Sequence, residues 1–326
     1  NADSRAALIG NYHGTSSEYI TVLEGIREEA GDDVRILYSQ GCDLYKDKVE
    51  NLAWDQDRIS EAVITAENSD VVILCVGLNE TLEGEEGDTG NSDASGDKVD
   101  LHLPKVQEEL IEKVTAVGKP TIVVLMAGSA IDLNYAQDNC NGILLAWYPG
   151  ARGGRAIADL LFGKESPSGK LPITFYKDLE GMPEFTDYSM KNRTYRYMEK
   201  EALYPFGYGL TYSDTCVTEA EVVGEVSAES DIMLKATVKN NGTVDTDEVV
   251  QVYIKDLDSP LAVRNYSLCG FKRVSLKAGE EKSVEFTISN KAMNIVDEDG
   301  NRYIAGKHFR LFAGVSQPDT RSAELT

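Results

Sequence analysis

Residues 78–100 hold the densest group of side chains that could transfer protons. Three carboxylates, Glu83, Glu85 and Glu86, lie within four residues, and Gly84 separates the first two. Residues 83–100 carry seven acidic side chains and one lysine, a net charge of −6. Crowding by like charges favours the protonated form of a carboxyl group, which suits a general acid. A proton donor among these glutamates is therefore one interpretation of the segment, and it requires a carboxyl group that is crowded or partly desolvated.

Two other interpretations of this segment stay open. A run of acidic residues is most often a solvated surface loop. Calcium is the second alternative, because four side chains offer hard oxygen ligands in a loop that contains glycine: Asp88, Asn91, Asp93 and Asp97. Their spacing does not match the twelve-residue EF-hand loop, and no glutamate stands at its last position. The calcium pattern is the weaker of the two.

The elements around this segment alternate between strands and helices. Strands that are apolar at nearly every position are separated by amphipathic helices, which implies a mainly parallel sheet flanked by helices, an α/β sandwich. Ligands of such sheets bind at the carboxyl ends of the strands, and the acidic segment directly follows one of them. We expect strands at residues 34–38, 70–77, 121–126 and 142–147, and helices at 18–29, 58–68, 104–117 and 131–136.

The chain after residue 215 has a different pattern. Apolar and polar residues alternate with period two, turn signals separate the runs, and no long helical pattern interrupts them, as in an antiparallel β-sandwich. Prolines and aromatic residues are frequent before it, which is typical of an ordered connector. We predict an α/β domain over 1–180, an aromatic connector over 181–214 and an all-β domain over 215–326, with strands near 232–238, 248–255, 282–288 and 308–315.

Composition excludes several classes of function. The chain has 55 acidic against 32 basic residues, a net charge of −23 that would repel nucleic acid and anionic membranes. Its longest apolar runs are far shorter than the ~20 residues that span a bilayer. The five cysteines lack C-x-x-C spacing, which argues against a disulfide framework. We expect free thiols, no partner among nucleic acids or membranes, and a cytoplasmic location, with secretion not excluded.

Other chemical motifs are poorly formed. His13, His102 and His308 are far apart in sequence and have no neighbours at metal-ligand spacing. Residues 127–129 do not form a G-x-S-x-G nucleophile elbow, and residues 148–154 lack the spacing of a phosphate-binding loop. The sequence therefore predicts no metal and no cofactor.

Read together, the motifs resemble the carboxyl-terminal half of a glycoside hydrolase family 3 enzyme of the β-xylosidase and β-glucosidase type. The resemblance extends over nearly the whole chain and combines many short motifs. They are 10–14 (GNYHG), 76–79 (VGLN), 82–86 (LEGEE), 101–104 (LHLP), 146–150 (AWYPG), 156–163 (AIADLLFG), 167–172 (PSGKLP), 193–197 (RTYRY), 204–211 (YPFGYGLT) and 240–250 (NNGTVDTDEVV).

The resemblance implies an α/β sandwich domain followed by a fibronectin type III-like domain. In this family a retaining mechanism uses an aspartate nucleophile on a TIM barrel and a glutamate acid/base on the sandwich domain. Glu85, after Gly84, matches the acid/base best. Glu83 is its rival, because residues 87–97 are an insertion relative to the family's shorter loop.

No barrel is present in the chain, which begins near what resembles the family's first sandwich strand, residues 6–10. The resemblance therefore implies a portion of a longer or split β-glycosidase, inactive by itself. Its partners would be the barrel that carries the nucleophile and a β-linked glucoside or xyloside as substrate. A non-catalytic carbohydrate-binding or structural module is the alternative, although such a module would not need the glutamate loop. The sequence decides neither the sugar nor whether the chain forms a homo-oligomer.

Overall fold

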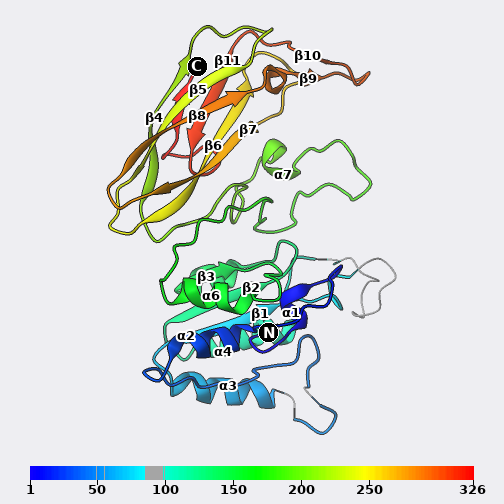
Figure 1. Ribbon diagram of the computed structural model, residues 1–326. Coiled ribbons are helices and arrows are strands. Elements are labelled where there is room, and N and C mark those ends of the chain that lie inside the picture. Colours follow the sequence, from blue (N-terminus) through cyan, green and yellow to red (C-terminus); the bar gives the residue numbers. More distant parts are fainter. Residues whose placement is uncertain (49, 55, 85–97, 99) are drawn as a thin grey trace. The chain divides into compact units, whose positions relative to one another are not determined.

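The computed structural model describes residues 1–48, 50–54, 56–84, 98 and 100–326, which form two compact units (Figure 1). The first unit consists of residues 1–164 and 177–179, and the second of residues 165–176 and 180–326. Residues 165–176 thus belong to the all-β unit, although they precede the sequence boundary predicted at residue 180. None of the helices in the described residues has the length and apolar character that a bilayer crossing requires.

The first unit is built on a parallel sheet of strands β1 (Val72–Gly77), β2 (Thr121–Met126) and β3 (Gly142–Leu145), in the order β1-β2-β3. The central strand β2 is buried at five of its six positions, which explains its continuous apolar sequence. Among the described residues, the helices that flank the sheet include α2 (Val22–Ala30), α3 (Asp57–Glu67), α4 (Lys105–Thr115), α5 (Asn134–Asn139) and α6 (Gly153–Leu161). The predicted helix-flanked parallel sheet is confirmed.

Helices α2 and α6 cover one face of this sheet. Val22 and Ile157 pack there on Val124 and Met126 of the central strand. A capping box begins α2, because the Thr21 hydroxyl accepts a hydrogen bond from the Glu24 amide (3.2 Å) while the Glu24 carboxylate accepts one from the Thr21 amide (2.8 Å). Local sequence signals and tertiary packing therefore agree in placing α2.

Two strands predicted for the first unit do not form. Residues Ala6–Ile9 are a helical turn, α1, and residues 34–38 are not a strand. Short apolar runs fit either a helix or a strand, so the packing around them decides which of the two forms. Residues 34–40 run beside β1 but make no backbone hydrogen bond to it within the described part of the chain. Instead, the Gln107 side chain accepts from the Gly77 amide and donates to the Gly77 carbonyl, both at 2.8 Å.

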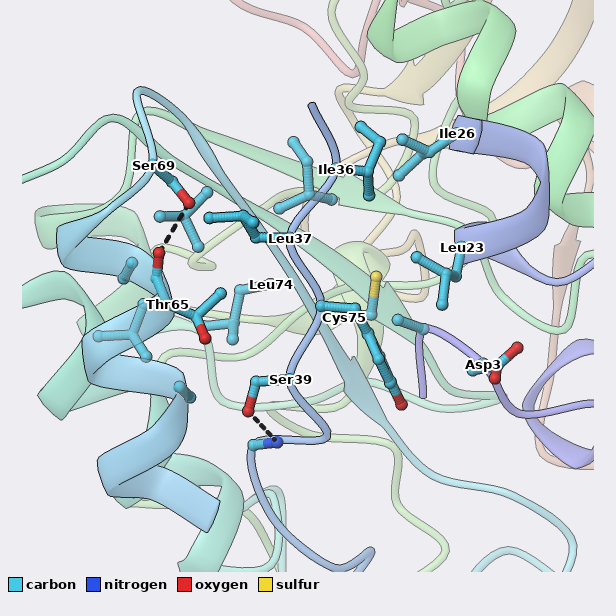
Figure 2. A pocket seen from close by; sticks show the side chains of 18 of the residues that line it. Asp3, Leu23, Ile26, Ile36, Leu37, Ser39, Thr65, Ser69, Leu74 and Cys75 are labelled. Atoms are coloured by element: carbon cyan, nitrogen blue, oxygen red, sulfur yellow. Dashed lines mark hydrogen bonds between the residues drawn. The ribbon is translucent and has the colours of Figure 1, made fainter. Parts of the chain in front are cut away.

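A pocket of about 1010 Å³ lies where the missing strand was predicted. Figure 2 shows Ile36 and Leu37 together with Leu74 and Cys75 of β1 among the residues that line it. The helix predicted over residues 131–136 begins later, as α5 at Asn134. A turn precedes it, in which the Asp132 carboxylate accepts a hydrogen bond from the Asn134 amide (2.9 Å).

The second unit is an antiparallel sandwich of two sheets, with strand orders β12-β11-β6-β7 and β4-β5-β8. Leu234, Val252, Phe286 and Leu311 from both sheets meet in its core. The predicted all-β sandwich is therefore confirmed. Its strands are β4 (Thr215–Val223), β5 (Ile232–Asn240), β6 (Thr246–Asp256), β7 (Ser267–Leu276), β8 (Glu281–Ile288), β11 (Phe309–Gly314) and β12 (Ala323–Leu325), with a small β9 (Ile295–Val296) and β10 (Arg302–Tyr303) pair.

Aromatic rings hold part of the segment that precedes the sandwich. Tyr195 of the short helix α7 (Thr194–Tyr197) stacks on Phe206 with ring centres 4.3 Å apart. Both rings also meet Tyr253 of β6 edge to face, at 6.1 and 6.5 Å. This packing explains why the segment is rich in aromatic residues.

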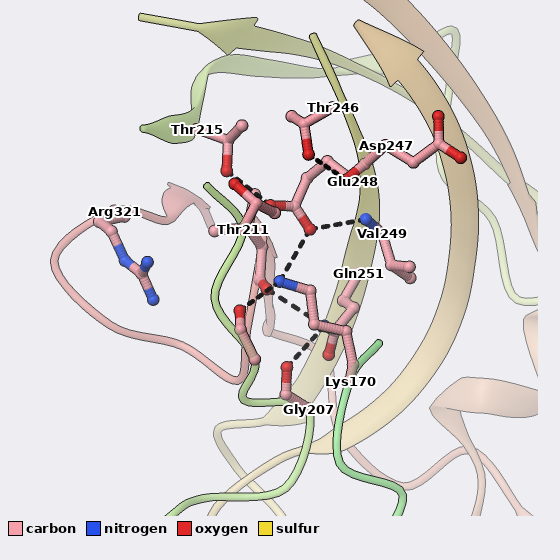
Figure 3. A network of polar contacts seen from close by, with 12 residues as sticks. Lys170, Gly207, Thr211, Thr215, Thr246, Asp247, Glu248, Val249, Gln251 and Arg321 are labelled. Carbon is pink, nitrogen blue, oxygen red and sulfur yellow. Dashed lines mark hydrogen bonds and ion pairs between the residues drawn. The ribbon is translucent and has the colours of Figure 1, made fainter. Parts of the chain in front are cut away.

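A buried ion pair attaches residues 165–176 to the same sandwich (Figure 3). The Lys170 ammonium lies 2.8 Å from the Glu248 carboxylate, and their side chains are only 8% and 1% exposed. Lys170 also donates to the Gly209 carbonyl (2.7 Å), while Glu248 accepts from the Thr215 hydroxyl (2.5 Å) and the Val249 amide (2.6 Å). Both charges are therefore compensated inside the protein.

Candidate active site

Glu83 lies in the loop that leaves the carboxyl end of β1. A tight turn holds this loop, because the Asn79 carbonyl accepts from the Leu82 amide (3.0 Å) and the Glu83 amide (2.9 Å). The Asn79 side chain also accepts from the Thr81 amide (2.9 Å) and hydroxyl (2.7 Å). Leu82 is buried, so side-chain packing anchors the turn as well. The backbone of Glu83 is thus held by its own loop.

The Glu83 carboxylate receives donors from the ends of the two other strands. The Gly128 amide, which follows β2, donates to Oε2 at 2.6 Å. The neighbouring Ser129 hydroxyl donates to Oε1. The Tyr148 hydroxyl, which follows β3, donates to Oε2 at 2.5 Å. Both carboxylate oxygens are therefore engaged as acceptors, and Glu83 joins the carboxyl ends of all three strands.

The Tyr148 ring is fitted closely into its place. A methyl group added at Gly10 would lie 2.5 Å from a ring carbon, and one added at Gly128 would lie 3.0 Å from another. Trp147, directly before it, has a φ of 54°, a left-handed conformation that bulky residues rarely adopt. Burial raises the pKa of Tyr148, and its hydrogen bond to Glu83 raises this pKa further, so the hydroxyl keeps its proton and acts as a donor.

Lys98 reaches the same region from the far end of the acidic segment. Its ammonium group donates to the Ala130 carbonyl at 3.1 Å. Burial lowers the pKa of Lys98, while the nearby carboxylates of Glu83 and Asp100 oppose this shift. Glu83 and Lys98 thus both attach to residues 128–130, and they flank the stretch that contains Glu85.

The structure therefore describes one of the two candidate acid/base residues. Glu83 is in the described part of the chain, whereas Glu85 lies outside it, together with Glu86 and the four residues considered for calcium. The sequence analysis did not identify Ser129 or Tyr148 as partners of Glu83. Both are polar residues just after predicted parallel strands, which is the signal that could have found them.

The described residues offer no group of three or more histidine, cysteine or acidic side chains placed to hold a metal ion. His102 instead pairs with Glu108 (2.9 Å), and His308 pairs with Asp258 (3.1 Å), both at exposed positions. All five cysteines are free.

Comparison with known proteins gives a consistent result. Residues 1–212 match the glycosyl hydrolase family 3 C-terminal domain, and residues 248–317 match a fibronectin type III-like domain. A beta-xylosidase of Formosa agariphila is 34% identical over 98% of this chain, and a periplasmic beta-glucosidase of Salmonella typhimurium is 30% identical over 96%.

Among solved structures, a family 3 β-glucosidase of Bifidobacterium adolescentis matches 97% of the chain with a TM-score of 0.82 and 30% identity. The chain spans less than half of these proteins: 43% of the xylosidase, 44% of the Salmonella glucosidase and 46% of the Bifidobacterium structure. The predicted family resemblance is confirmed.

Proposed function

The chain belongs to glycoside hydrolase family 3, and from this premise we propose that it supplies the acid/base carboxyl group of a retaining β-glycosidase. The observation that carries the proposal is the anchored glutamate loop. Glu83 is tied to the carboxyl ends of all three parallel strands, where sheets of this kind place their ligands. The two relatives, a beta-xylosidase and a beta-glucosidase, support β-linked xylosides or glucosides as substrates.

We assign the acid/base role to Glu85 and not to Glu83. A general acid must present a proton to the leaving group and later take one from water, so at least one of its oxygens has to be free for the substrate. Both oxygens of Glu83 already accept hydrogen bonds from the protein. Glu85 is the next glutamate along the chain, directly after Gly84.

The proposed reaction has two steps. In the first step, a carboxylate nucleophile attacks the anomeric carbon while Glu85 protonates the departing glycosidic oxygen, which leaves a covalent glycosyl-enzyme. In the second step, Glu85 takes a proton from water as the water displaces the nucleophile with overall retention. The nucleophile would come from a TIM barrel in the part of the enzyme that this chain does not cover.

The test uses an enzyme that contains this half together with its barrel. Glu85→Gln should lower turnover of alkyl β-glycosides by about 10²- to 10⁴-fold, because their departure needs protonation. Nitrophenyl glycosides depart with little protonation, so their first step should change far less. Azide needs no general base, and it should restore the second step and yield a glycosyl azide of retained configuration.

Glu86→Gln is the matched control, since it removes an adjacent charge and should leave this leaving-group dependence unchanged. If azide rescues the Glu83→Gln enzyme and does not rescue the Glu85→Gln enzyme, the acid/base role belongs to Glu83. If none of these variants loses activity, the non-catalytic alternative is favoured.

A further inference from the structure

The hydrogen bond between Glu83 and Tyr148 has no role in the proposed acid/base chemistry described above. We propose that both are positioning residues, which fix the point from which the segment bearing Glu85 leaves the sheet. This inference rests on the proposed function. It concerns how the acid/base is held, and neither residue is assigned a contact with the substrate.

The first argument is the short distance along the chain. Glu85 follows Glu83 by two residues, and a fully extended chain spans only ~7 Å over that number. The hydrogen bonds to the Glu83 carboxylate therefore hold the chain close to the point from which the Glu85 segment continues. Lys98 attaches the other end of the segment to Ala130 (3.1 Å), next to the Gly128 and Ser129 groups that bind Glu83.

The second argument is that Tyr148 is itself immobilised. Its ring fits between Gly10 and Gly128, where an added methyl group would approach to 2.5 and 3.0 Å. The left-handed conformation of Trp147 directs the chain into this position, at a cost that packing around it must offset. A hydroxyl held this rigidly gives Glu83 a fixed donor, at 2.5 Å.

The third argument separates positioning from stability. Tyr148→Phe removes only the hydroxyl and leaves the ring between its glycines, so the packing of the first unit is retained. Oε2 of Glu83 then keeps the Gly128 amide and loses one of its two donors. The expected consequence is a displaced carboxylate in a folded protein.

The experiment measures Tyr148→Phe in the enzyme that contains this half and its barrel. We expect kcat/KM for alkyl β-glycosides to fall by about 10- to 100-fold, because misplacing a catalytic group by ~1 Å costs on the order of 10²-fold. Nitrophenyl glycosides should lose much less, and the basic limb of the kcat/KM pH profile should shift, since it reports the acid that protonates the leaving group.

The matched control is Tyr253→Phe, which removes another buried tyrosine hydroxyl, a donor to Gln251 at 2.6 Å in the β-sandwich. It should change neither the leaving-group dependence nor the pH profile. Ser129→Ala, which removes the donor to Oε1, is the second variant and keeps the test valid if Tyr148→Phe does not fold. The double variant Glu83→Gln/Tyr148→Phe should lower kcat/KM by less than the product of the two single fold-losses, because the two residues act as one unit.

Equal losses with alkyl and nitrophenyl substrates would overturn the positioning role, as would a Tyr253→Phe enzyme that behaves like Tyr148→Phe. The proposed function fails separately. It is refuted if Glu85→Gln shows no leaving-group dependence, whereas a normal Glu85→Gln result with an unchanged Tyr148→Phe enzyme refutes only the positioning role.

Discussion

Lys170 offers the sharpest test of how the second unit is held together. Lys170→Met retains much of the aliphatic stem and removes the ammonium group, so the buried Glu248 carboxylate loses the cation that lies 2.8 Å from it. Breaking a buried ion pair from one side costs about 3 to 5 kcal/mol. Glu248 keeps the Thr215 hydroxyl and the Val249 amide as donors, so we expect the lower end, about 3 kcal/mol.

This loss can be read by differential scanning calorimetry of the chain. For a unit of this size, each kcal/mol shifts the melting temperature by about 2 to 4 °C, so the variant should melt about 6 to 12 °C lower. Lys277→Met is the matched control, because its ammonium lies at the same 2.8 Å from Asp245 while both side chains are exposed, 79% and 57%. Exposed pairs contribute little, and this control should melt close to the wild type.

A second variant tests the cause of the effect. Adding Glu248→Gln to Lys170→Met removes the uncompensated charge and keeps an oxygen that can accept from Thr215, so part of the lost stability should return. The reasoning is refuted if Lys170→Met melts no lower than Lys277→Met, or if the double variant melts no higher than Lys170→Met.

Three further predictions follow from the first unit and from the chain as a whole. The isolated chain should not turn over nitrophenyl β-xyloside or β-glucoside, because an acid/base without the proposed nucleophile forms no glycosyl-enzyme; robust hydrolysis by the purified chain would contradict this. Gly10→Ala should lower the free energy of unfolding by more than Gly163→Ala in denaturant titrations, since both have positive φ (58° and 71°) but only Gly10 meets the Tyr148 ring. His102 should titrate above its ordinary pKa in NMR because its imidazolium hydrogen-bonds Glu108. The small stabilising effect is present below the unfolded-state pKa and is lost as pH rises through the raised pKa, and Glu108→Gln should reduce the shift.

Periodicity along the chain was sufficient for most of the fold. Strands β1 and β2 and helices α3 and α4 form within about two residues of their predicted limits, because each buries a continuous or amphipathic apolar face that its own sequence encodes. The antiparallel sandwich followed from period-two alternation for the same reason. The motifs, in turn, were specific enough to indicate the family.

The sequence could not settle elements whose type depends on a partner. Residues 6–9 and 34–38 are apolar runs that suit a helix or a strand, and the outcome depends on whether the neighbouring edge of β1 is available. At Gly77 that edge is occupied by the amide of Gln107, thirty residues away in sequence. Such a side chain contact leaves no mark in local periodicity.

The candidate site divides in the same way. The acidic cluster after a buried strand made the Glu83 region a candidate site from sequence alone, because open parallel sheets use the carboxyl ends of their strands. Only the tertiary structure revealed that Ser129 and Tyr148, 46 and 65 residues further along the chain, donate to Glu83. Parallel strands joined by helical crossovers bring their carboxyl ends to one edge of the sheet, and which side chains meet there depends on strand order and register, which are properties of the folded sheet.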